Sequence, residues 1–120
     1  MTSSRHLLFT AAALSMMALS LPAFAAPTAI TVDEAGEGGQ PMTLKIEPST
    51  VKAGDAVFHV HNDAVSEEHE MILVHLKSAD QKIPLNTSKH RVDEKKLQSL
   101  GEVADLKPGA SGEMKATLKP

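Results

Sequence analysis

The sequence predicts an all-β fold, a sandwich of short strands in one domain. Apolar and polar residues alternate in several short segments, which is typical of half-buried strands. Polar turns that contain Gly or Pro separate these segments. The chain has 120 residues, which is enough for one domain and too short for a barrel enzyme.

The first 25 residues are expected to be a secretory signal. Arg5 supplies the positive charge, residues 7–21 form an apolar run, and Ala23-Phe24-Ala25 has the small residues of a cleavage site. We expect cleavage between Ala25 and Ala26, which places residues 26–120 in a periplasm or outside the cell. The apolar run is short for a spanning helix, so no membrane contact is expected after cleavage.

Five strands are expected in the mature domain. In the first, Ile30 and Val32 share one face. In the second, Met42, Leu44 and Ile46 alternate with polar residues, which indicates a half-buried strand. The five segments are residues 28–34, 42–47, 56–61, 70–76 and 113–118.

The remaining segments are expected to connect these strands. The fourth strand contains the unbroken apolar run 71–74, which suits burial on both faces. Residues 78–92 are polar and are expected to form a long loop that leaves the sheet. Residues 93–100 are expected to form a short helix, with Asp93 as its cap and Gly101 just past its end.

Composition excludes several classes of function. The chain contains no Cys, which rules out a disulfide scaffold, a zinc-thiolate site and a thiol nucleophile. Its formal net charge of −3 argues against nucleic acid as a partner. No nucleophile, base and orienting residue stand in a recognisable pattern, so we expect the protein not to be an enzyme. Phe58 is the one aromatic residue of the mature domain, which predicts marginal stability.

The histidines are the candidate metal ligands. His59 and His61 share a strand face and could clamp a metal, although a solvated face is the simpler interpretation. His75 is expected to be a polar residue at a strand end, and His90 lies in a charged loop where a solvated side chain is expected. His69 differs, because it lies where a polar loop enters the most apolar strand.

The region around His69 resembles the cupredoxins, the small blue-copper proteins. The resemblance begins with the turn Pro48-x-x-Val51-x-x-Gly54-Asp55 and a strand that ends in Asn62. It continues with a loop and with His69-Glu70-Met71 at the start of the next strand, and residues 105–112 with the strand after them are also similar. It covers residues 28–120 and implies a Greek-key β-sandwich of cupredoxin type. It also implies an exported copper protein that transfers electrons to a periplasmic redox partner or handles copper.

The resemblance implies that His69 is a copper ligand, and no other residue of the chain matches a ligand position. In the family, a Cys, a second His and an axial Met come from one C-terminal loop, which would follow Pro120. The domain is therefore expected to lack its final strand and that loop. A blue-copper centre needs two imidazoles and a thiolate, so the site is incomplete in this chain.

Three interpretations of this gap stay open. The sequence is a truncated copy of a copper protein, or the missing strand comes from another chain, or the fold has lost its copper. Two other functions also stay open. One is a thiolate-free periplasmic copper carrier that uses exposed His and Met side chains, such as those of His59, His61, His75 and Met71. The other is a metal-free β-sandwich that serves as an interaction module.

Overall fold

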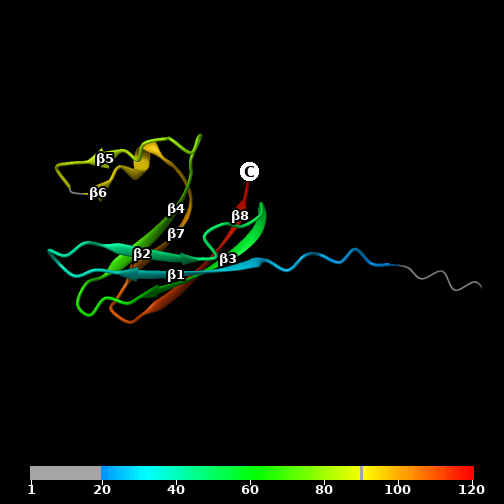
Figure 1. Ribbon diagram of the computed structural model, residues 1–120, viewed down its shortest axis with the longest axis horizontal. Helices are drawn as coiled ribbons and strands as arrows, with labels where there is room; N and C mark the ends of the chain where they lie inside the picture. The colour runs from blue at the N-terminus through cyan, green and yellow to red at the C-terminus, as the bar shows by residue number, and fades with distance from the viewer. Residues whose placement is uncertain (1–19, 90) are drawn as a thin grey trace, which may run out of the picture.

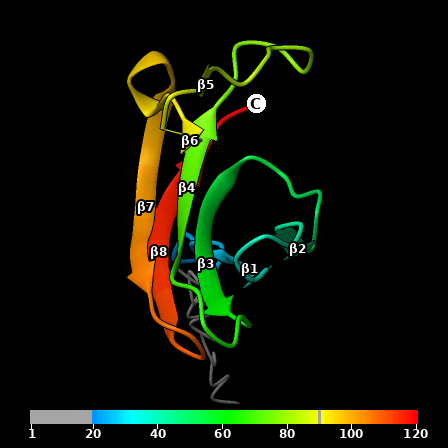
Figure 2. The same cartoon turned by 90° about the vertical axis from the view of Figure 1, so that its left-hand side faces the viewer.

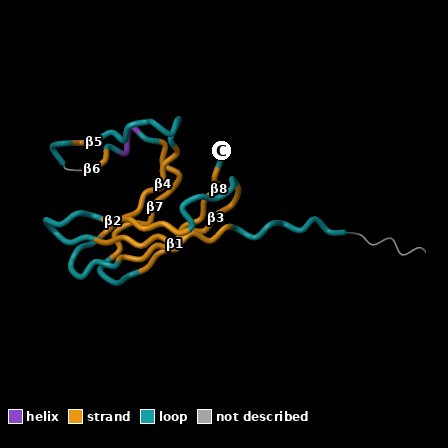
Figure 3. Tube along the Cα trace, viewed as in Figure 1, coloured by secondary structure: helices purple, strands orange, loops and turns teal. Residues whose placement is uncertain are grey.

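The structure is a computed structural model that describes residues 20–89 and 91–120, and it confirms the predicted all-β class. Figure 3 shows strands and loops with one short helical turn. In the described part of the chain, no helix is long and apolar enough to cross a membrane. The predicted signal, residues 1–25, lies outside the described residues as far as residue 19, and residues 20–27 form exposed irregular backbone.

Eight strands and one 3₁₀ turn follow one another along the described residues. The elements are β1 (Thr28–Ala35), β2 (Thr43–Glu47), β3 (Gly54–Asn62), β4 (His69–His75), β5 (Leu85–Asn86), β6 (Arg91–Val92), η1 (Glu94–Lys96), β7 (Gln98–Leu106) and β8 (Ser111–Leu118). All five predicted strands are present, with small differences at their ends. Strand β7 and the short β5–β6 hairpin were not expected.

The strands form two facing layers and the small hairpin. The larger sheet has the order β2-β1-β3-β8, and the second layer is the pair β4-β7. Strand β1 pairs antiparallel with β2 and parallel with β3. That parallel pair differs from the antiparallel arrangement that we expected, because β2 and β3 flank β1 and run in opposite directions. Figure 1 shows that the β5–β6 excursion lies apart from the larger sheet.

The core lies between strands β1, β3 and β8 of the larger sheet and the β4–β7 layer. Strand β7 packs on β8 and β3, and Figure 2 shows β1 and β2 on the far side of β3 from β7. A Cβ atom at Gly112 would lie 2.4 Å from Val103 Cγ1, so glycine permits the close approach of β8 to β7. The core residues are Ile30, Val32, Ala56, Phe58, Val60, Met71, Val103, Leu106 and Met114.

The predicted helix over residues 93–100 is wrong. Only Glu94–Lys96 form a 3₁₀ turn, and the Asp93 side chain makes no capping hydrogen bond. From Gln98 the chain is extended and pairs with β4. Gly101 lies inside β7 at φ 147°, instead of ending a helix. Pairing with β4 prevails because so short a helix has little stability of its own.

Burial also differs from expectation in two strands. We expected β2 to be half-buried, but all five of its residues are exposed. We expected the run 71–74 to be buried on both faces, but only Met71 is buried and the next three residues are half-buried. Both differences have one cause, which is that the second layer contains two strands and the larger sheet contains four.

Candidate functional site

His69 is the first residue of β4 and is buried, with 8% of its surface exposed. Its Nε2 atom lies 3.0 Å from the carbonyl oxygen of Gly36. A carbonyl oxygen can only accept a hydrogen bond, so Nε2 carries the proton and donates it. The neutral ring then has its lone pair on Nδ1, which has no hydrogen-bond partner among the described residues.

Gly36 holds the acceptor for His69 in the loop between β1 and β2. Its backbone has φ 138°, a conformation that residues other than glycine rarely adopt. A Cβ atom there would lie 2.9 Å from Met42 Sδ and 3.0 Å from Met42 Cα, so a side chain would force Met42 to shift. The glycine therefore fixes the position of the carbonyl that orients the imidazole.

Asn62 anchors the loop that leads into His69. The residue is fully buried, and its Nδ2 donates to the carbonyl oxygens of Glu67 and Leu106 at 2.8 Å each. Its Oδ1 accepts a hydrogen bond from the backbone N–H of Ala64 at 2.9 Å. These three bonds tie the end of β3 to the loop and to β7, so the approach of the chain to His69 is rigid.

Glu37 holds the outer part of the same loop from the β1–β2 side. Its carboxylate accepts hydrogen bonds from the backbone N–H groups of Val65 and Ser66 and from the Ser66 hydroxyl. The Ser66 hydroxyl, followed by the Val65 N–H, lowers the pKa of Glu37 from its ordinary value. The Glu37 carboxylate therefore joins loop 36–40 to loop 63–68.

The His69 side chain borders a cavity of about 170 Å³ between β4 and the β1–β2 hairpin. The cavity is lined by Glu34, Ala35, Met42, Thr43, Leu44, His69 and Glu70. The Oε2 atom of Glu34 is buried and has no hydrogen-bond partner among the described residues. Burial raises the pKa of Glu34, the positive charge that His69 carries when it is protonated opposes that rise, and Glu70 adds to it. An imidazole, a thioether and two carboxyls thus line one small cavity.

The pair His59 and His61 lies elsewhere, on the outer face of β3. His59 Nδ1 is 3.1 Å from Glu113 Oε2, and both side chains are half exposed. His61 Nδ1 lies 2.7 Å from Ser111 Oγ, and His61 Nε2 lies 3.3 Å from Asp63 Oδ1. Each of these histidines is already paired with its own neighbours on the surface.

The set suggested for a thiolate-free carrier is not brought together. Met71 is buried in the core, so the expectation that it is exposed is wrong. His75 is half-buried at the far end of β4 from His69. His90 lies outside the described residues. Only His59 and His61 share a surface, as their spacing predicted.

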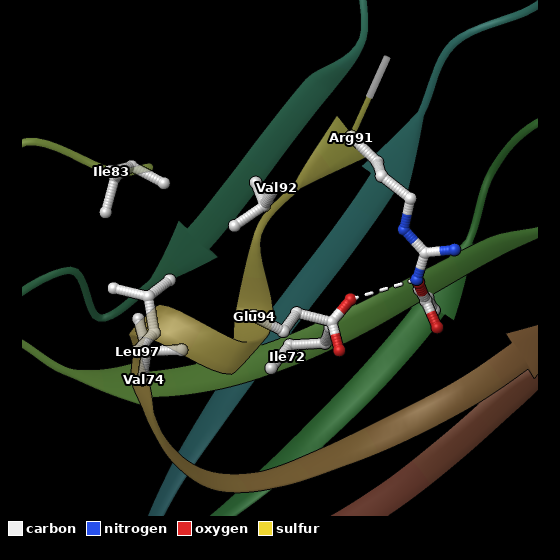
Figure 4. Close-up of a pocket in the computed structure, with 8 residues that line it drawn as sticks. Ile72, Val74, Ile83, Arg91, Val92, Glu94 and Leu97 are labelled. Atoms are coloured by element: carbon white, nitrogen blue, oxygen red, sulfur yellow. Dashed lines mark hydrogen bonds and ion pairs between the residues drawn. The ribbon is translucent and has the colours of Figure 1, made fainter. Parts of the chain in front are cut away.

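A second cavity, of about 280 Å³, lies on the outer face of β4 under the 83–97 excursion (Figure 4). Its walls are mainly apolar. Arg91 borders it and pairs with Glu94 at 3.1 Å and with Glu70 at 4.0 Å. The apolar lining residues are Ile72, Val74, Ile83, Val92 and Leu97. No nucleophile or histidine lines it, so it offers an apolar surface and the two ion pairs of Arg91, without a catalytic group.

Within residues 20–89 and 91–120, no group of three His, Cys, Asp or Glu side chains is placed to hold a metal ion. That His69 is a copper ligand therefore stays a prediction. Comparisons with family models, with curated proteins and with solved structures each give no match.

Proposed function

We propose that this is an exported copper-binding β-sandwich protein of cupredoxin type, in which His69 supplies an imidazole ligand to the ion. One observation carries the proposal. The Gly36 carbonyl fixes the proton of His69 on Nε2, which leaves the Nδ1 lone pair without a partner among the described residues, and the His69 side chain lines a small cavity. Metal-binding histidines commonly donate their second N–H to a carbonyl or carboxylate in this way, which orients the ring.

The rigidity of the surroundings supports the same role. Asn62 and Glu37 hold the loop before His69, so the imidazole keeps its orientation without a bound ion. The Met42 thioether borders the same cavity, and thioethers are ligands that Cu(I) prefers. A preorganised imidazole lowers the entropy that binding must overcome.

The donor groups of this chain do not fit a blue-copper centre. That centre needs a thiolate, and the sequence contains no Cys. The proposed role is therefore copper handling, with His69 as one ligand of an ion whose other ligands come from solvent or another molecule. Electron transfer through a blue-copper centre would need a thiolate from outside these 120 residues.

Copper titration of matched variants tests the proposal. His69→Gln keeps an N–H donor for the Gly36 carbonyl and removes the ring nitrogen, and His75→Gln is the control on the same strand. Loss of a second-shell partner alone lowers metal affinity about 10–100-fold. We therefore expect His69→Gln to weaken Cu(I) binding at least tenfold and His75→Gln to have little effect.

Three results would overturn the proposal. The first is that the unchanged protein binds copper no more tightly than a non-specific control protein. The second is equal losses in the two variants, which would mean that binding is diffuse. The third is an intense blue absorption band with Cu(II), because such a band requires a thiolate ligand. Absence of specific binding would favour the metal-free interaction module.

A further inference from the structure

The outer edge of β4 has no strand beside it. Strand β4 pairs with β7 on one side only, and no strand among residues 20–89 and 91–120 pairs with its other side. The backbone N–H and C=O groups that point away from β7 therefore lack a ladder partner in the described chain. Such an edge is a template for another extended chain.

An apolar surface lies next to this edge. The register pairs Leu44 with Glu34 and Ile46 with Val32, so the β2 side chains point to the same face as buried residues of β1. That face is directed toward the second layer. Nevertheless Met42, Leu44 and Ile46 are 66%, 56% and 40% exposed. The second layer does not extend over β2, as Figure 2 shows.

The edge and the apolar surface meet at the cavity beside His69, and we call this whole surface the edge groove. It comprises the outer edge of β4 and the side chains of Glu34, Met42, Leu44, Ile46 and Glu70. The 170 Å³ cavity at His69 forms one end of it. At that end the unpartnered, buried Oε2 of Glu34 lies near Glu70, so the groove is acidic there and apolar along β2.

We propose that the edge groove accepts one extended β-strand from a partner chain. The partner strand pairs with the outer edge of β4 through backbone hydrogen bonds, as in other cases of strand addition. Its alternate side chains are apolar and cover Met42, Leu44 and Ile46. A basic side chain at one end lies beside Glu34 and Glu70, where it supplies the hydrogen bond that the Glu34 carboxyl lacks. The proposal does not depend on copper.

The geometry argues against a second copy that uses its own β4. If the β4 edges of two copies paired antiparallel, a twofold axis perpendicular to the β4–β7 layer would relate the copies. The larger sheets of both copies would then lie on the same side of the joined layer. Strand β3 of the second copy would then lie where β1 and β2 of the first copy already extend. A single strand that is not backed by its own sheet avoids this clash.

A designed peptide tests the groove in the copper-free protein. The probe alternates valine and threonine and carries lysine at one end, and its binding is followed by fluorescence anisotropy and by hydrogen exchange of the β4 amides. Leu44→Asp and Ile46→Asp are expected to weaken binding at least about tenfold, since a carboxylate would be buried under the strand. Val65→Asp is the control, because Val65 is 86% exposed in a loop outside the groove.

Two further peptides sharpen the test. A peptide that is N-methylated along one edge cannot form the ladder with β4, so we expect no binding from it. A peptide with norleucine in place of lysine should bind more weakly than the lysine probe. The double variant Glu34→Gln/Glu70→Gln, which lacks both carboxylates, should bind the two peptides equally. The proposal is overturned if the probe does not bind, if β4 amides gain no protection, or if Leu44→Asp binds as Val65→Asp does. A concentration-dependent dimer that protects the same amides would identify a second copy as the occupant and would also contradict it.

Discussion

Strands β3 and β2 belong to the same sheet and have the same alternation of apolar and polar residues, yet only β3 is buried. Ala56, Phe58 and Val60 lie under the β4–β7 layer and are at most 6% exposed. The corresponding side chains of β2 point to the same face and remain in solvent. Alternation thus decides which face of a strand is apolar, and the second layer decides whether that face is covered.

His69 lies at the border between the two regions. It opens β4, in the layer that covers β3, and it contacts through Gly36 the loop that leads into the exposed strand β2. The border is where a buried side chain can keep one atom accessible. This position explains how a rigid imidazole and a small cavity occur together.

The largest expected effect is in the covered half. Phe58→Ala removes the one aromatic side chain of the core and should lower the free energy of unfolding by about 3–5 kcal/mol. Leu44→Ala, on the uncovered face, should change it by no more than about 0.5 kcal/mol. Urea melts of both variants make the comparison. Similar losses would mean that β2 is covered in solution, and the contrast between the two halves would be wrong.

A smaller effect is expected where the two layers are joined. Asn62→Ala leaves the buried carbonyl oxygen of Leu106 without its donor, at a cost of about 1–3 kcal/mol, and it also removes the donor of the part-buried Glu67 carbonyl. The control is Asn86→Ala in the exposed hairpin, where the amide accepts only surface hydrogen bonds. Urea melts should show a loss for Asn62→Ala alone. Equal stability of the two variants would show that the loop before His69 is not anchored as described.

The smallest expected effect is a pH dependence at the border. Burial raises the pKa of Glu34 above its ordinary value of 4.5, so the folded protein retains a proton that the unfolded chain has lost. The contribution of Glu34 to the free energy of unfolding is therefore fully present below pH 4.5. It is lost as the pH rises through the raised pKa of the folded state.

Glu34→Gln removes this titration. Relative to the unchanged protein, the variant should gain stability as the pH rises from 4 to 8. Melts at several pH values measure this difference, and the subtraction removes contributions from the other carboxylates. A difference that does not change with pH would mean that Glu34 is solvated.

The sequence was sufficient for the parts of the fold that depend on local alternation. It predicted five of the six longer strands. The exception is β7, because Leu97 just before this strand and Leu100 and Val103 within it recur every three positions and imitate a helix. Only the pairing of β7 with β4 decides otherwise. Alternation could also have identified Glu34 as buried, because it follows Ile30 and Val32 on the same face.

The candidate site was predicted only as far as one residue. The position of His69 before an apolar strand indicated a special histidine, but its partner Gly36 is 33 residues away. No local pattern contains that contact or the carbonyl acceptors of Asn62. The exposure of β2 was equally out of reach, because it depends on how far the second layer extends.

The protonation state of the His69 ring tests the central claim most directly. A long-range ¹H–¹⁵N spectrum of the protein, recorded before and after one equivalent of Cu(I), distinguishes the two ring nitrogens. We predict a proton on Nε2 and a bare Nδ1 before addition, and a change at His69 Nδ1 that His59 and His61 do not share after it. A proton on Nδ1 at neutral pH, or an unchanged His69 in the presence of Cu(I), would contradict the account.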